Sequence, residues 1–176
     1  YKKQRRGGVG VVDLDTKEED FITSFVTTST HSDLLFFTNK GRVYQMKMYD
    51  VPEGRRATRG KSVMNFLQLT EDEKVTSILP LSKSDKQSKK SLMMITLNGE
   101  GKKVAAESFH DVRRSGIIAI KLGEADALVS AFLVEKGDDV IIGTSDGQSI
   151  RFKESDVREM GRAAGGVRLI KLSKKD

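Results

Sequence analysis

Apolar and polar positions along the chain alternate with a period of two, in short runs that end at turn signals. Residues 34–37 form an apolar run that reaches the turn 38–41, and Tyr44, Met46 and Met48 then alternate with polar residues. This pattern is typical of a hairpin with one solvated face. Further strands are predicted at 21–30, 63–69, 75–81, 92–96, 103–106, 117–122, 128–134, 140–144, 149–153 and 167–172. Helical periodicity is weak, and only single helical turns are expected, at 105–109 and 154–160.

The same order of elements occurs three times. Each hairpin turn carries Thr-x-x-Gly, and each is followed by Asp-Val, by arginines, by a glycine and by a further strand. The turns lie at Thr38/Gly41, Thr96/Gly99 and Thr144/Gly147. A period of about fifty residues with strand-turn-strand content is typical of propellers and related β arrays.

The repeat predicts an all-β fold, a propeller-like array of four-stranded blades of which this chain supplies about three. Residues 1–33 are expected to hold a glycine-rich loop and the start of the first blade. Blade-like repeats are expected at 34–81, 92–134 and 139–172. The polar segment 82–91, SKSDKQSKKS, is inserted between the first two and is expected to be a mobile surface loop.

Positive charge is concentrated in particular places. The chain has 31 Lys and Arg against 25 Asp and Glu, a net charge of +6. Residues 1–12 and residues 54–70 each carry four cations and no anion. Such patches suit a polyanion, either nucleic acid or an anionic membrane surface.

Arginines recur at the same place in each repeat. If each repeat is one blade, equivalent loops fall at equivalent positions, and their arginines would trace a stripe around one rim. The pairs concerned are Arg5/Arg6, Arg55/Arg56, Arg113/Arg114 and Arg158/Arg162. A stripe can follow a curved phosphate backbone without reading bases. The alternative is that these arginines only keep a β-rich surface soluble, or pair with nearby acidic residues.

Catalytic chemistry has little support in the sequence. Cysteine is absent, which excludes disulfides and thiolate sites, and the two histidines, His31 and His110, lie in unrelated contexts. No phosphate-binding Walker loop and no apolar run of membrane-spanning length occur. We expect an intracellular, non-enzymatic chain, and because it begins at Tyr1 we expect it to be part of a longer protein.

The opening heptapeptide Gln-Arg-Arg-Gly-Gly-Val-Gly, residues 4–10, carries a resemblance. It resembles the gyrase A box, the signature of the DNA-wrapping domain at the C-terminus of the DNA gyrase A subunit, and departs from it only at Val9, where a cation is expected. Residues 36–44, 59–61, 150–155 and 160–162 also look like that family's blade sequences.

The resemblance implies a β-pinwheel, a propeller-like disc whose neighbouring blades exchange a strand, with double-stranded DNA wrapped around its basic edge. It implies a place in an ATP-dependent type IIA topoisomerase, DNA gyrase, a heterotetramer with the B subunit in the bacterial cytoplasm, associated with the nucleoid. ATP and Mg would bind elsewhere, and no cofactor or metal is expected in this part. The DNA-binding set predicted from box and arginine loops together is Lys2, Lys3, Gln4, Arg5, Arg6, Gly7, Gly8, Gly10, Arg55, Arg56, Arg59, Lys61, Arg113, Arg114, Arg158 and Arg162.

Three alternatives stay open at this point. The C-terminal domain of the topoisomerase IV A subunit is similar but has a degenerate or missing box, and Val9 favours it slightly. A propeller scaffold that binds an acidic protein partner is the second, and a basic membrane-surface module, which no amphipathic helix supports, is the third. About three blades make an open half-disc with unpaired strand edges, so we also predict that the isolated chain dimerises or exchanges strands.

Overall fold

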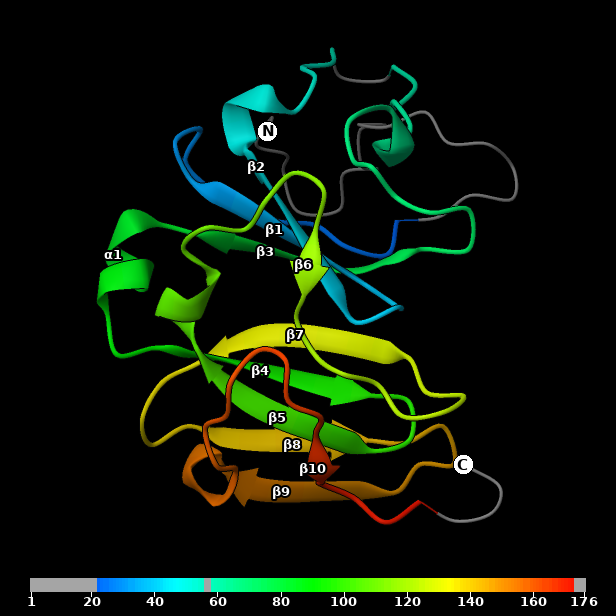
Figure 1. Ribbon diagram of the computed structural model, residues 1–176, viewed down its shortest axis with the longest axis vertical. Coiled ribbons are helices and arrows are strands. Elements are labelled where there is room, and N and C mark those ends of the chain that lie inside the picture. The colour runs from blue at the N-terminus through cyan, green and yellow to red at the C-terminus, as the bar shows by residue number, and fades with distance from the viewer. Residues whose placement is uncertain (1–21, 56–57, 173–176) are drawn as a thin grey trace, which may run out of the picture.

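The computed structural model describes residues 22–55 and 58–172 of the chain. In this part the chain forms two four-stranded antiparallel sheets and one two-stranded hairpin (Figure 1). Helical structure is limited to the short helix α1 (Lys83–Gln87) and to single 3-10 turns. The prediction of an all-β chain is confirmed.

The first sheet has the strand order β3-β1-β2-β6. Its central strands are β1 (Asp33–Thr38) and β2 (Arg42–Lys47), the hairpin predicted from the alternating pattern. The outer strands are β3 (Val75–Leu81) beside β1 and β6 (Ile117–Ile118) beside β2. All six residues of β1 are buried, because the strand lies in the middle of the sheet and is covered on both faces.

The second sheet repeats this order as β7-β4-β5-β10. Its hairpin is β4 (Ser91–Thr96) with β5 (Glu100–Ala105), flanked by β7 (Leu128–Val134) and β10 (Val167–Arg168). The third hairpin, formed by β8 (Asp139–Gly143) and β9 (Ser149–Lys153), stands alone among the described residues.

Edge strands are exchanged between repeats. The strand β6 follows the second hairpin in the chain but pairs with β2 of the first, and β10 follows the third hairpin but pairs with β5 of the second. Two hydrogen bonds beyond each exchanged strand fix the crossing. The carbonyl of Gly41 accepts the N–H groups of Ala119 and Ile120, at 2.9 and 3.1 Å, and the carbonyl of Gly99 accepts those of Leu169 and Ile170, at 2.9 and 3.2 Å.

The core lies between the stacked sheets. One apolar cluster joins the first two sheets, where the rings of Phe37 and Phe109 meet edge to face with centroids 6.0 Å apart. A second cluster joins the second sheet to the third hairpin through Met93, Val140 and Ile170. The sheets therefore pack as successive blades, each sharing apolar surface with its neighbour.

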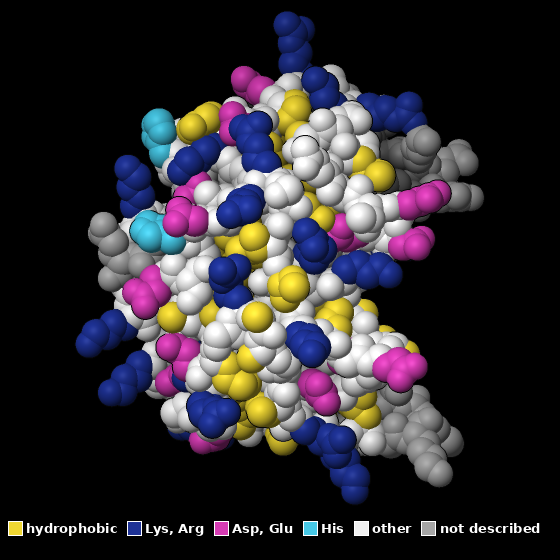
Figure 2. Space-filling model, in the orientation of Figure 1, with side chains coloured by type: hydrophobic (Ala, Val, Ile, Leu, Met, Phe, Trp, Pro, Cys, Tyr) yellow, Lys and Arg dark blue, Asp and Glu magenta, His cyan; other side chains and the backbone are white. Residues whose placement is uncertain are grey.

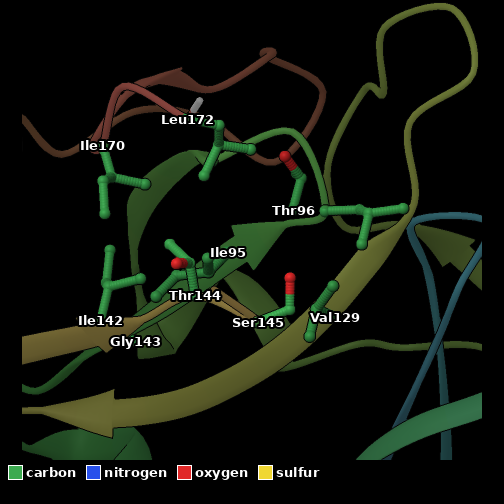
Figure 3. A pocket seen from close by; sticks show the side chains of 11 residues that line it. Ile95, Thr96, Val129, Ile142, Gly143, Thr144, Ser145, Ile170 and Leu172 are labelled. Atoms are coloured by element: carbon green, nitrogen blue, oxygen red, sulfur yellow. The ribbon is translucent and has the colours of Figure 1, made fainter. Parts of the chain in front are cut away.

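An apolar cleft of about 180 Å³ remains between the second sheet and the third hairpin (Figure 3). Aliphatic side chains make most of its wall, with Ile142, Val129 and Ile170 among them (Figure 3). No charged side chain lines it. The cleft therefore suits apolar packing between blades.

Two predicted strands are wrong. Residues 22–29 have no regular structure, although they are rich in β-branched side chains. Residues 63–69 begin with the 3-10 turn η2 (Val63–Asn65) and continue irregularly. Their apolar side chains, including buried Leu67, cover the outer face of the first sheet, so their hydrophobicity serves packing and not strand pairing.

Two of the remaining helical turns, at 106–109 and 154–156, lie where the sequence predicts single turns, whereas the turn at 48–50 is not predicted. The 3-10 turns η1 (Met48–Asp50), η3 (Ala106–Phe109) and η4 (Glu154–Asp156) each follow the second strand of a hairpin. The insert 82–91 contains α1 where the sequence predicts only a mobile loop. Ser82 and Asp85 form a capping box, which satisfies backbone donors at the helix start.

Candidate nucleic-acid interface

The predicted arginines of the second and third repeats lie in corresponding loops, each between a 3-10 turn and the strand exchanged with the neighbouring sheet. Arg113 and Arg114 lie between η3 and β6, and Arg158 and Arg162 lie between η4 and β10. The described cations of the first repeat, Arg55, Arg59 and Lys61, lie between η1 and η2 and are exposed. Of these loop cations only Arg162 is half-buried. Arg56 and the box residues Lys2, Lys3, Gln4, Arg5, Arg6, Gly7, Gly8 and Gly10 lie outside the described residues.

The exchanged strands bring two of these loops onto one face. The strands β6 and β10 both face the viewer in Figure 1. Figure 2 shows Lys and Arg side chains spread over this face from one end of the molecule to the other, with hydrophobic side chains and some Asp and Glu side chains among them. A surface that presents several cations on one face can attract a polyanion.

The loop before β6 is held by a cation of the first sheet. The guanidinium of Arg42, on β2, donates hydrogen bonds to the carbonyl oxygens of Ser115 and Gly116, at 3.1 and 3.2 Å. It also lies 5.9 Å from the ring centroid of Tyr44. Arg114 pairs with Asp50 at 3.1 Å, but its side chain is 78% exposed. An exposed pair of this kind is weak, so Arg114 stays available to an external anion.

The loop before β10 is held by a buried cation of the second sheet. Lys102, on β5, has no exposed surface, and its Nζ donates to three carbonyl oxygens: Gly161 at 2.9 Å, Arg162 at 2.5 Å and Ala164 at 2.8 Å. Burial, and then the nearby Arg162 guanidinium, lower the pKa of Lys102 to about 8. The amine is therefore still mostly protonated at pH 7, and its three N–H groups match the three acceptors.

Acidic residues near the loop before β10 form hydrogen bonds and ion pairs with other residues of the chain. Glu159 accepts a hydrogen bond of 2.8 Å from the Ser91 hydroxyl. Glu154 is buried and forms an ion pair with Lys103. The Lys103 ammonium, against the opposing effect of burial, holds the pKa of Glu154 below its ordinary value. These two carboxylates therefore already have partners within the chain, beside the basic loop.

Sequence reasoning missed several basic residues of this region. Lys102 and Arg42 act on the loop backbone from the neighbouring blade, and Arg168 is exposed on β10 itself. One signal for Lys102 was available: counted from Thr-x-x-Gly, it occupies the same position as the buried Tyr44. A lysine in that inward register needs internal acceptors.

Neither a candidate metal-binding cluster nor a membrane-spanning helix occurs among the residues that the structure describes. No group of three or more His, Asp or Glu side chains there could hold a metal ion. No helix in the described part is long and apolar enough to cross a membrane.

The strand exchange and the basic loops together define a propeller-like β domain with a cationic edge. The chain belongs to the family described as "DNA gyrase C-terminal domain, beta-propeller", whose model matches residues 1–29, 32–82, 90–135 and 138–176. This confirms the resemblance found at residues 4–10 and the expectation of a propeller-like fold.

Individual relatives agree with the family. The chain is 45% identical over 168 residues to the DNA gyrase A subunit of Clostridium acetobutylicum, covering 96% of this chain and 20% of that protein. It is 42% identical over 176 residues to the DNA gyrase A subunit of Escherichia coli, covering 100% of this chain and 20% of that protein. The chain thus spans about a fifth of the length of these curated relatives.

Solved structures give the same fold. The C-terminal domain of DNA topoisomerase IV is similar with a TM-score of 0.79 at 26% identity, over 92% of this chain and 50% of that one. The DNA gyrase A C-terminal domain is similar with a TM-score of 0.76 at 28% identity, over 99% of this chain and 55% of that one. This chain therefore corresponds to about half of each solved domain.

Proposed function

We propose that the chain binds and wraps double-stranded DNA without sequence preference, as part of the A subunit of a DNA gyrase that introduces negative supercoils using ATP. The observation that carries the proposal is the pair of arginine loops beside β6 and β10, in a chain of the gyrase C-terminal domain family. Cations at the exchanged edge of successive blades can contact successive phosphates. The box residues 2–10 would extend this surface, and their role stays a prediction.

Binding of this kind follows from counterion release. Each phosphate neutralised by a Lys or Arg side chain contributes about −0.9 to the slope of log affinity against log salt concentration. Contacts to the phosphate backbone carry no base information, so affinity should be nearly independent of DNA sequence.

Wrapping is tested by linking number. A closed circular plasmid is relaxed by a topoisomerase in the presence of the chain, the protein is removed, and the topoisomers are separated on a gel. We expect a shift in linking number that grows with protein concentration, because wrapped DNA is topologically constrained. An unchanged topoisomer distribution at saturating protein would exclude wrapping, and a gel-shift measurement on the same sample would show separately whether DNA is bound.

The loop before β6 gives a direct test of DNA binding. Replacing Arg113 and Arg114 together with alanine should weaken binding to a duplex about tenfold at about 0.1 M salt and reduce the salt slope by about 2. The matched control is the double replacement of Lys83 and Lys89 with alanine, which removes the same charge from exposed positions at the inserted segment. Equal losses in the two double variants would show that only net charge matters.

The same proposal implies partner subunits and a cellular location for the chain. The B subunit, together with the rest of the A subunit, would complete a cytoplasmic, nucleoid-associated heterotetramer, with ATP and Mg bound outside this chain. Dimerisation or strand exchange by the isolated chain also stays a prediction. The β8–β9 hairpin supports it, because both of its outer edges lack a partner strand in the described part.

Topoisomerase IV is the second candidate, raised by Val9 in the box, whereas the likeness to its C-terminal domain is shared with that of DNA gyrase A and does not separate the two. In that case the domain would bind DNA for decatenation or relaxation. The linking-number experiment separates the two, because constrained supercoils of one sign are expected only from a wrapping domain.

A further inference from the structure

Lys102 lies behind the cationic surface and not on it. It sits on β5 in the second sheet with no exposed side-chain area, while the loop that it contacts belongs to the third repeat. Its three hydrogen bonds reach the carbonyl oxygens of residues 161, 162 and 164. Three acceptors from a stretch of four residues converge on one ammonium group, so that group fixes the backbone of most of the loop.

The preceding blade contains a comparable contact. Arg42, on the second strand of the first sheet, donates to the carbonyls of Ser115 and Gly116 in the loop that carries Arg113 and Arg114. In both blades, a cation on the hairpin holds the backbone of the arginine loop that arrives from the next repeat. The two contacts differ in burial, since Arg42 is half-buried and Lys102 is fully buried.

We propose that Lys102 is a positioning residue for DNA binding, which holds the 161–164 loop so that Arg162 is presented to the phosphate backbone. This rests on the proposed DNA-binding function. Lys102 itself contacts no DNA, because the side chain is enclosed by the loop and the sheet. The conformation of one blade's basic loop thus depends on a residue of the neighbouring blade.

The test compares four variants of the full chain: Lys102→Met, Arg162→Ala, the two combined, and Lys40→Met. Lys40 is exposed at the turn between β1 and β2, so its replacement removes the same charge without touching the loop. The affinity for a duplex of about 40 base pairs is measured over a range of salt concentrations. A replacement that acts through one phosphate contact should reduce the salt slope by about 1.

We expect Lys102→Met to bind about five- to tenfold more weakly and to show the reduced slope of Arg162→Ala. The combined variant should be no more than about twofold weaker than either, because both changes remove the same contact. Lys40→Met should stay within about twofold of the parent chain. Equal affinities of Lys102→Met and Lys40→Met, or additive losses in the combined variant, would overturn the proposal.

Folding is monitored by circular dichroism at the temperature of the binding assay. A second variant, Lys102→Gln, keeps two N–H donors and should bind with intermediate affinity. If neither variant folds, Lys102 serves stability and the positioning role is overturned. If the parent chain itself fails to bind DNA, the proposed function fails, and this result is distinct because it appears before any variant is compared.

Discussion

Gly99→Ala is expected to lower the free energy of unfolding by about 3 kcal/mol. Gly99 has φ of 75°, and a Cβ there would lie 2.8 Å from Cγ2 and 3.0 Å from the carbonyl oxygen of Ile170. The same glycine's carbonyl accepts the N–H groups of Leu169 and Ile170 just after β10. The added methyl group must therefore strain the turn and push away the chain that crosses from the third repeat. Urea unfolding at neutral pH measures the change.

The matched control for this change is Gly147→Ala. Gly147 occupies the corresponding turn of the third hairpin with φ of 80°, but a Cβ there would have open space, with no described atom beyond its chain neighbours within 4 Å. Only the cost of a left-handed backbone applies there, about 1 kcal/mol. The difference between the two variants isolates the contact with the crossing chain. Equal losses of stability would show that the crossing chain yields without cost.

The hairpins could be predicted because their signals are local. The alternation of apolar residues and the Thr-x-x-Gly turns lie close together in the chain, and β1, β2, β4, β5, β8 and β9 all occur where these signals predict them. The strand exchange carries no such signal. Residues 117–122 and 167–172 show strand character in the sequence, but nothing in them specifies that they pair with the preceding repeat.

The repeat in the sequence predicts the corresponding positions of the second and third basic loops, but it does not predict the side chains that hold them. The Asp-Val, arginine and glycine repeat located Arg113 and Arg162 in corresponding loops. The contacts of Arg42 and Lys102 end on backbone carbonyls, which every residue carries. Residue types alone therefore give no pattern that pairs these cations with a loop. The strand predicted at 63–69 is wrong for a related reason. Hydrophobicity alone does not distinguish a strand from a loop that covers a sheet.

Glu73→Ala is expected to lower the free energy of unfolding by about 3–4 kcal/mol at pH 7. Glu73 is 5% exposed, and its carboxylate accepts hydrogen bonds from the Thr38 hydroxyl at 2.6 Å and the Tyr44 hydroxyl at 2.8 Å. The backbone N–H and hydroxyl of Thr70 add two more, each at 3.2 Å. Removing the carboxylate leaves these donors without their acceptor beside the first sheet. Glu71→Ala, an exposed change in the same turn, should stay within about 0.5 kcal/mol of the parent chain.

The carboxylate of Glu73 should also make the free energy of unfolding fall at acid pH. Burial alone would raise the pKa of Glu73, but the hydrogen bonds from Thr38, Tyr44 and Thr70 outweigh it and hold that pKa below the ordinary value of 4.5. A carboxyl group with a lowered pKa in the folded state stabilises the fold above its unfolded pKa, and this contribution is lost as pH falls through the folded pKa. The stability difference between the parent chain and Glu73→Ala should therefore be constant at neutral pH and shrink below about pH 4.5. Urea unfolding at a series of pH values measures it. A difference that grows on acidification would mean that folding raises the pKa of Glu73, and it would contradict a carboxylate stabilised by these four donors.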